Sequence, residues 1–408
     1  MRISTTTMTL ALALISGLLA RREALAQKLS LPVTSGKKVV EYGWDAPTPA
    51  YLAAHLGDME KRPFDGILFH LEAKANVLEP KALDESQLAK DLEAIDRIHW
   101  KKFSDNFLMM FAAAKQDWFD DQQWKTIEQN TRLVARAAKR AKCVGVCFDP
   151  EPYGANPWAY RQALRRHKMS FADYQVVVRK RGGQFVRSIE RELPGAKILT
   201  FFHVSLFGTL CRPMPLERRE AELAKASYAL LPAFIEGMAQ GAQTHVEIID
   251  GNENAYYYTN NCRYLDSYHL VTQRARYLIA PGAWPAYLNT VRMGQALYID
   301  QYYGLRQNTK TLGNVMTHEE QVKWLEHNTY WALYTTDRYV WCYSERMNWW
   351  TGDVPAGAED AICRARNAID AGRPLSFDLG PIIKAAEAKA NRKKARPRKA
   401  PMSGSRKP

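Results

Sequence analysis

Short apolar runs alternate with helix-type patterns along most of the chain. Eight runs rich in apolar and β-branched residues predict strands at 39–45, 64–70, 107–111, 143–149, 198–203, 245–250, 296–300 and 339–345. Between and after them, apolar residues at helical spacing predict helices near 48–61, 86–98, 121–141, 170–192, 217–240, 263–279, from 317 onward and 357–371. Alternation predicts a parallel sheet, and eight units predict an α/β fold of the (β/α)8 TIM barrel type with extended loops after the strands.

An open, doubly wound sheet is the alternative fold. That fold should carry a glycine-rich phosphate turn after its first strand, and Gly43-Trp44-Asp45 is no such turn. No linker-like composition interrupts the body of the chain. We therefore expect one barrel domain over residues 27–383.

Both ends of the chain differ from this body. Residues 1–26 have the pattern of a signal peptide, with Arg2, an apolar run over 8–20 and the small-x-small site Ala24-Leu-Ala26. The run is too short to span a bilayer comfortably, so we expect cleavage, export to the periplasm or medium, and no remaining transmembrane span. An uncleaved anchor is the alternative, because Arg21 and Arg22 follow the run.

Most of the net charge of +14 lies in residues 384–408, which hold ten Lys or Arg against one Glu. Such a composition predicts a basic disordered tail. The body is nearly neutral, so we expect no specific nucleic-acid partner. The tail could bind anionic envelope polymers. Nothing in the sequence indicates the oligomeric state.

The strand at 143–149 carries the strongest candidate chemistry. Alternation places Val144, Val146 and Phe148 on one face, and Cys147 and Asp149 on the other. In a barrel the small-residue face points inward, and Pro150 stops the ladder directly after Asp149. Glu151 follows on the same side. Two carboxyl groups are thus predicted at the C-terminal mouth, where barrel enzymes carry their active sites.

Other strand ends add acidic, histidine and aromatic residues to this predicted mouth. Aromatic faces stack on the C–H faces of sugar rings, so acids rimmed by aromatics are typical of a carbohydrate site. Candidate catalytic carboxyls besides the first pair are Glu247, Asp300 and Glu345, and the predicted substrate-binding residues are Trp44, Asp45, His70, Tyr153, His203, Asp250, Glu253, Tyr298, Trp341 and Tyr343.

Glycoside cleavage needs one protonated carboxyl group to donate to the leaving oxygen and a second, ionised one to attack or to activate water. We expect Glu151 to be the donor, with Asp149, Asp300, Glu247 or Glu345 as its partner, in that order. No cofactor is expected. The six cysteines lack the spacing of a zinc site, and no metal is expected.

Two short motifs resemble the (β/α)8-barrel glycoside hydrolases. Phe148-Asp-Pro-Glu-Pro-Tyr153 is similar to the acidic end of their fourth strand, and its Asp-x-Glu spacing is similar to the close of the chitinase-type motif. Tyr339-Val-Trp-Cys-Tyr-Ser-Glu345 is similar to their Trp-bearing eighth strand. Gly145 and Cys147 stand where the chitinase-type motif has aspartates, and the Asn-Glu pair of the largest retaining clan is absent from the fourth strand. The resemblance implies an exported bacterial branch of this superfamily that cleaves an oligo- or polysaccharide.

Two other functions fit the same pattern. A metal-dependent barrel hydrolase would draw ligands from strand ends, with Asp45, His70, His203 and Glu247 as candidates. Against it, no His-x-His follows the first strand and no HExxH helix is present. A carbohydrate-binding barrel without catalysis is the other alternative.

Overall fold

The computed structural model describes residues 36–73, 76–306 and 311–395, and this part contains one parallel nine-stranded sheet. Its strands are β1 (Lys38–Gly43), β2 (Gly66–Phe69), β3 (Phe107–Phe111), β4 (Gly145–Asp149), β5 (Lys197–Thr200), β6 (Glu247–Asp250), β7 (Val291–Met293), β8 (Gln295–Tyr298) and β9 (Tyr339–Ser344). Their order is β7-β6-β5-β4-β3-β2-β1-β9-β8. The predicted parallel sheet is confirmed.

A single residue joins the two edges of this sheet. β7 pairs with β6, β8 pairs with β9, and only Gly294 separates β7 from β8. The Gly294 amide donates to the Asp250 carbonyl at 2.7 Å. A Cβ atom at 294 would lie 2.9 Å from Ile249 Cγ2 and 3.0 Å from the Asp250 carbonyl oxygen. Residues 291–298 thus act as one strand, and the ring closes as a (β/α)8 barrel.

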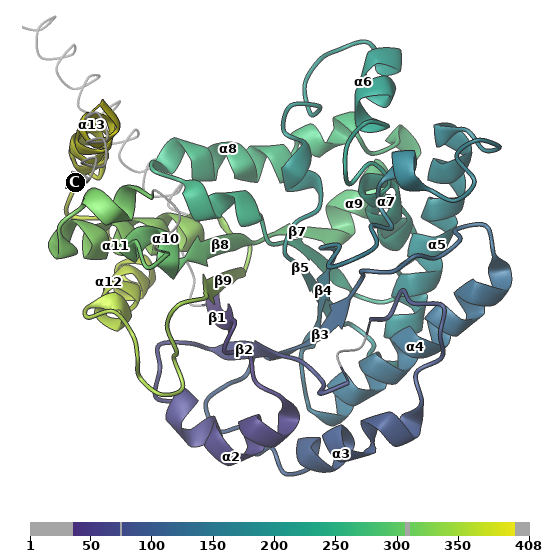
Figure 1. The fold of residues 1–408 in the computed structure, drawn as a ribbon, viewed down its shortest axis with the longest axis horizontal. Helices are drawn as coiled ribbons and strands as arrows, with labels where there is room; N and C mark the ends of the chain where they lie inside the picture. The colour runs from purple at the N-terminus through teal and green to yellow at the C-terminus, as the bar shows by residue number, and fades with distance from the viewer. Residues whose placement is uncertain (1–35, 74–75, 307–310, 396–408) are drawn as a thin grey trace, which may run out of the picture.

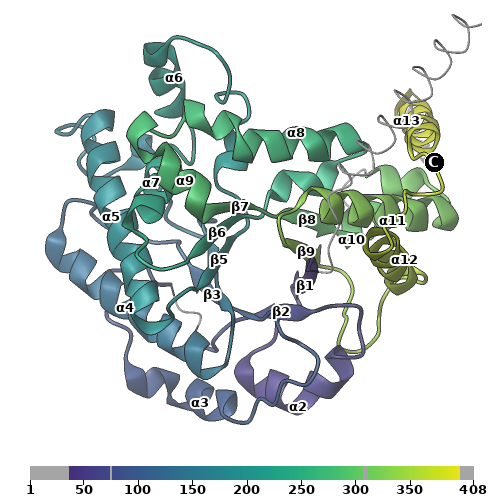
Figure 2. The same cartoon turned by 180° about the vertical axis from the view of Figure 1, so that it is seen from behind.

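Helices surround the strands (Figures 1 and 2). They are α2 (Pro49–Met59), α3 (Glu85–Ile95), α4 (Asp121–Arg140), α5 (Phe171–Glu192), α6 (Leu216–Leu223), α7 (Leu231–Gly241), α8 (Asn261–Thr272), α9 (Trp284–Thr290), α10 (Ile299–Tyr303), α11 (His318–Thr335), α12 (Ala358–Asp370) and α13 (Gly380–Ala395). A capping box formed by Thr317 and Glu320 begins α11. The helix predicted over 217–240 is instead two helices, α6 and α7, and Pro232 lies in the first turn of the second.

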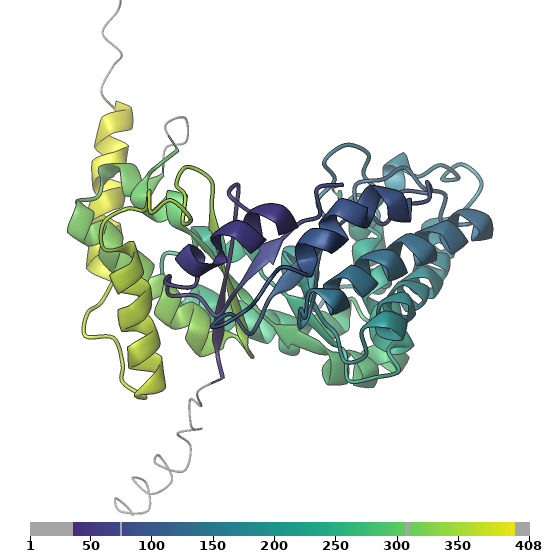
Figure 3. The ribbon, with the colours of Figure 1, turned by 90° about the horizontal axis from the view of Figure 1, so that it is seen from below.

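Helix α13 corrects the prediction of a disordered tail from residue 384. It lies at the edge of the molecule near α12 (Figure 3) and contacts the short 3-10 helix Leu312–Val315. Ile383 and Ala386 are buried, and Lys389 pairs with Glu320 at 3.4 Å. The apolar residues at a spacing of three bury one face, although the total charge is high. Residues 396–408 lie outside the described part.

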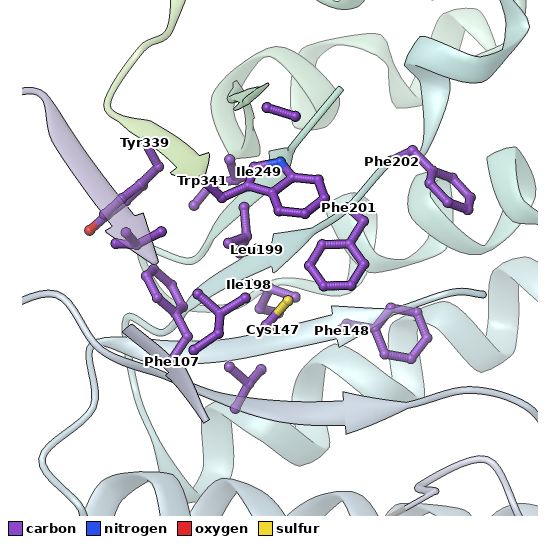
Figure 4. Close-up of a cluster of buried hydrophobic side chains, with 14 of the residues drawn as sticks. Phe107, Cys147, Phe148, Ile198, Leu199, Phe201, Phe202, Ile249, Tyr339 and Trp341 are labelled. Carbon is purple, nitrogen blue, oxygen red and sulfur yellow. The ribbon is translucent and has the colours of Figure 1, made fainter. Parts of the chain in front are cut away.

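The interior of the barrel is filled by side chains that alternate along the strands. Phe201 and Trp341 stack with ring centroids 4.4 Å apart and an angle of 18° between the rings, and they lie near Cys147 (Figure 4). On the opposite face of β4, Phe148 contacts Phe185 and Phe234 on the outer helices. The predicted alternation of β4 is therefore confirmed, and Asp149 belongs to the inward face.

Within residues 36–395, apart from the two short gaps, no helix is long and apolar enough to cross a membrane. The six cysteines are free. The predicted signal peptide, residues 1–26, lies outside the described residues, so export stays a prediction.

Candidate active site

The end of β4 forms the centre of the candidate site. Asp149 is fully buried, and its Oδ1 accepts the backbone amide of Glu151 at 2.8 Å. The other oxygen, Oδ2, is buried without a hydrogen-bond partner among the described residues. Trp158 Nε1 donates to the Pro150 carbonyl at 2.8 Å, which fixes the turn between the two acids. The structure thus places the predicted acid pair in one rigid turn.

The pKa values of both carboxyl groups of this pair are raised above their usual range. Burial, followed by the charge of Glu151, raises the pKa of Asp149 well above its usual range. Burial also raises the pKa of Glu151, while a hydrogen bond from the Tyr153 hydroxyl opposes this shift. Two neighbouring carboxyls with raised pKa values are suited to acid–base chemistry near neutral pH.

A third acid, Glu253, reaches the pair from the loop after β6. Its backbone amide donates to the Phe201 carbonyl at 3.0 Å, and the preceding Asn252 adopts a left-handed conformation with φ of 45°. Asn252 is held by Asp250 Oδ1 at 3.0 Å and by Gln295 Oε1 at 2.8 Å. Burial and the charge of Glu151 raise the pKa of Glu253 to about 8. A strained loop held at several points therefore presents Glu253 to Glu151.

Aromatic rings line the barrel beside these acids. Tyr343 stacks on Tyr256 at 5.5 Å and on Tyr42 at 5.6 Å, and Tyr298 lies 5.3 Å from Tyr343. The charges of Asp149 and Glu151 contribute to the raised pKa of Tyr42, after burial. Trp341 beneath them donates from Nε1 to the Gly251 carbonyl at 2.8 Å. Tyr298, Trp341 and Tyr343, which were predicted to bind substrate, thus face into the barrel.

Two tyrosines near the acids, Tyr42 and Tyr228, were not among the predicted site residues. Burial raises the pKa of Tyr228, and the charges of Glu151, Glu253 and Asp149 add to the shift. Side chains alternate along β1 as they do along β4, and this alternation places Tyr42 on the inward face. Tyr228 precedes α7 in a segment predicted as helix, so no pattern indicated it.

Exposed aromatics mark the rim of the mouth. Trp44 is 63% exposed, Tyr153 67% and Tyr257 61%. The Arg346 guanidinium lies over the Trp44 ring, 4.9 Å from its centroid. A cavity of about 610 Å³ opens between the ends of β1, β2 and β3, and Trp44, His70 and Tyr153 are among its lining residues. These three predicted substrate-binding residues therefore share one cavity.

Two predicted catalytic acids anchor the loop after β9 or lie beside it. Asp300 lies in the first turn of α10, and its oxygens accept the backbone amides of Glu345 at 2.8 Å and Arg346 at 2.9 Å. Strand β8 ends at Tyr298, so the alternation of side chains along this strand does not extend to Asp300. Glu345 pairs with Arg306 at 3.3 Å and accepts from the Tyr343 hydroxyl. Asp300 thus positions the loop after β9, and Glu345 lies at the mouth beside Tyr343; a catalytic role for either stays a prediction.

Glu247 lies at the opposite end of the barrel from Asp149. It is the first residue of β6 and pairs with Lys197, the first residue of β5. A separate cavity at that end has Glu247, Lys37 and Arg338 in its lining. Glu247 was predicted to lie at the mouth with the other acids. Its position at the start of β6 instead places it far from Asp149 along the barrel axis.

The remaining predicted residues belong to polar networks outside the acid cluster. Asp250 accepts from the Ser205 amide at 2.8 Å and hydroxyl at 2.6 Å and lies 3.0 Å from His203 Nδ1, all in a fully buried setting. Burial lowers the pKa of His203, so this imidazole is neutral at pH 7. These contacts hold the loops after β5 and β6, and substrate binding by His203 and Asp250 stays a prediction.

Asp45 also has a structural partner. Its Oδ2 accepts the Trp349 amide at 2.9 Å, and the fully buried Glu41 lies beside it. Burial and the charge of Asp45 raise the pKa of Glu41 well above its usual range. Asp45 therefore anchors the loop that carries Trp349, and substrate binding by Asp45 stays a prediction.

The ligand set of the metal-dependent alternative is not brought together. Asp45 contacts the Trp349 loop, His203 contacts Asp250, and Glu247 lies at the other end of the barrel. Across the described ranges, no group of three or more His, Cys, Asp or Glu side chains could hold a metal ion.

No protein-family model and no curated protein matches the sequence. Solved structures that the chain is similar to include a GH18 chitinase from Pseudoalteromonas aurantia (TM-score 0.40, 11% identity, 80% of this chain and 99% of that chain). Others are a glucosidase from Croceicoccus marinus (0.37, 10%, 82% and 68%) and a phosphonopyruvate hydrolase in complex with oxalate and Mg²⁺ (0.31, 11%, 90% and 96%). At these identities and TM-scores the comparisons assign neither a family nor an activity; the barrel assignment follows from the strand pairing of this chain.

Proposed function

We propose that the protein is an exported glycoside hydrolase that cleaves an oligo- or polysaccharide at the C-terminal mouth of the barrel. The observation that carries this proposal is the cluster of Asp149, Glu151 and Glu253 within a mouth lined by aromatic rings. Acids that hold a proton near neutral pH supply the chemistry of glycosidic cleavage. Exposed aromatic faces beside them suit the C–H faces of sugar rings.

We assign proton donation to Glu151. It lies at the strand end, accepts the Tyr153 hydroxyl, and is more exposed than the fully buried Asp149 behind it. Glu253 takes the place of Asp300 and Glu247 as the second carboxyl with access to substrate. Burial, followed by the charge of Glu151, raises the pKa of Glu253 to about 8, so this pair of acids retains a proton near neutral pH. When Glu151 holds that proton, Glu253 carries the charge that attack or water activation requires.

The experiment is a screen of the protein lacking residues 1–26 against a glycan panel, beside Glu151→Gln, Asp149→Asn and Glu253→Gln. On the glycan that turns over, we expect all three variants to lose activity. Aryl glycosides with activated leaving groups then separate the roles, because they need little proton donation. We expect them to restore turnover of Glu151→Gln and not of Glu253→Gln.

Two results would contradict the catalytic part of this proposal. Variants as active as the parent would exclude the acid cluster as the catalytic centre. Tight binding of intact oligosaccharide without cleavage would favour the sugar-binding barrel. Export is tested separately by mass spectrometry of the mature N-terminus, which we expect at Gln27.

A further inference from the structure

The cavity between the ends of β1, β2 and β3 has an aromatic and apolar wall. Its volume of about 610 Å³ falls within the range of about 300–1,000 Å³ that is usual for small-ligand sites. The described lining consists of Tyr42, Gly43, Trp44, Ala46, His70, Asn76, Met109, Phe111, Ala113 and Tyr153. This described wall contains four aromatic rings and no Asp, Glu, Lys or Arg.

Trp44 is held as a platform at the edge of this cavity. The Arg346 guanidinium lies over its ring at 4.9 Å, and the Arg346 backbone is fixed by Asp300 at 2.9 Å. The ring nevertheless remains 63% exposed. A large apolar surface whose orientation is fixed before a ligand arrives loses little entropy on binding.

Tyr153 connects the cavity to the acid cluster. Its ring lines the cavity, and its hydroxyl donates to Glu151. A ligand in the cavity therefore lies next to the proposed proton donor. The neighbouring acid cluster disfavours a carboxylate on that ligand, because its ionised member repels a second negative charge and burial of an unpaired charge is costly.

Polar groups are also present in the wall. His70 Nδ1 lies 2.9 Å from the Leu71 carbonyl oxygen, so Nδ1 carries the hydrogen and Nε2 is an acceptor. The Asn76 side-chain amide donates to the Ala113 carbonyl. An acceptor in an aromatic wall is the combination that orients a hydroxylated ring.

We propose that this cavity is a subsite for an uncharged sugar ring, stacked on Trp44 and joined to the bond that Glu151 cleaves. This inference rests on the proposed function only in one respect, which is that the bond to be cleaved lies at Glu151. The stacking itself is a binding property and can be measured without turnover. It also predicts that the substrate must extend beyond the cleaved bond into the cavity.

The test measures oligosaccharide binding by calorimetry in the Glu151→Gln protein, which removes cleavage from the readout. The probes are neutral cello-, xylo-, malto- and chito-oligosaccharides of increasing length, and the same oligosaccharides oxidised to uronates at C6 where that carbon is present. We expect Trp44→Ala to weaken binding of the neutral probe about tenfold, the loss typical of one aromatic stacking contact. Arg346→Gln should give a smaller loss, and Tyr334→Ala, an exposed aromatic on the outer helix α11, should give none.

The outcomes separate the subsite from the catalytic proposal. If binding depends on Trp44 and the unsubstituted protein cleaves no glycan, the result supports the subsite and contradicts the proposed hydrolase activity. Cleavage that is unaffected by Trp44→Ala, or uronates that bind as tightly as the neutral probes, would overturn the subsite. Circular dichroism of each variant shows whether the fold is retained; if Trp44→Ala is unfolded, Trp44→Leu replaces it.

Discussion

The backbone amide of Glu151 donates to Asp149 Oδ1 at 2.8 Å, two residues away in the same turn. This bond sets the direction in which the Glu151 side chain leaves the strand end. The other oxygen of Asp149 is buried without a described partner, and a buried polar atom without a partner is costly. We attribute that cost to function: Asp149 orients Glu151 and holds a proton behind it.

Substitution of the two acids should separate these effects. Glu151→Gln keeps the shape but removes the proton, so we expect kcat to fall by about 10²–10⁴-fold, the usual contribution of general acid catalysis. Asp149→Ala should lower kcat as well, because the Glu151 amide loses its acceptor. Steady-state kinetics on the glycan identified by the panel measures both.

Glu247→Gln is the matched control for these substitutions. Glu247 is also an inward acid of the barrel, but it pairs with Lys197 at the opposite end. We expect its kcat/KM to stay within about twofold of the parent. A loss comparable to that of Glu151→Gln would show that the assignment of the two ends is wrong.

Asp300 should matter through the loop that it holds. Asp300→Ala leaves the amides of Glu345 and Arg346 without their acceptor, and we expect the free energy of unfolding to fall by about 2 kcal/mol. Asp300→Asn retains an acceptor oxygen and should cost less. Urea unfolding measures both, and equal stability of Asp300→Ala and the parent would contradict the anchoring role.

Glu253 should make stability depend on pH. Its pKa rises from 4.5 to about 8 in the folded protein, so the folded state binds more protons than the unfolded state between these values. Stability from this group therefore falls as pH rises through that window. Glu253→Gln removes the effect.

The measurement is the Tm of the parent and of Glu253→Gln at pH 5 and pH 9. We subtract the Tm of the parent from the Tm of the variant at each pH. We expect this difference to be about 2 °C larger at pH 9 than at pH 5. Glu345→Gln serves as a control at the same mouth. A Tm difference that is the same at both pH values would exclude the raised pKa of Glu253.

Truncation tests the end of the chain. A protein that ends at residue 395 keeps α13, and we expect its Tm to match the full chain. A protein that ends at residue 379 loses the buried side chains of Ile383 and Ala386. Burial of one large apolar side chain contributes about 1.5–3 kcal/mol, so we expect a Tm several degrees lower by calorimetry.

Much of the barrel could be predicted from the sequence, because each strand and helix buries a face with its own period. Val146 and Phe148 outside and Cys147 and Asp149 inside follow from alternation alone. The composition of residues 384–408 as a whole does not reveal helix α13. The buried face of α13 is short, and the Lys and Arg residues around it dominate the composition of this segment.

The site could be predicted only where a residue lies on a regular strand next to its end. Asp149 meets this condition, and Asp300 does not, because the strand ends before it. Glu247 shows a second limit, since alternation gives the direction of a side chain and not its height along the barrel axis. Tyr228 reaches the acids through an irregular segment that no periodicity describes.

Gly294 couples distant parts of the mouth. The strands on one side of it lead through β6 to Glu253, and those on the other side lead through β8 to Tyr298. A side chain at 294 would press on Ile249 and on the Asp250 carbonyl. Replacement of Gly294 by any other residue should therefore disturb both parts of the mouth at once, although Gly294 itself lies outside the acid cluster.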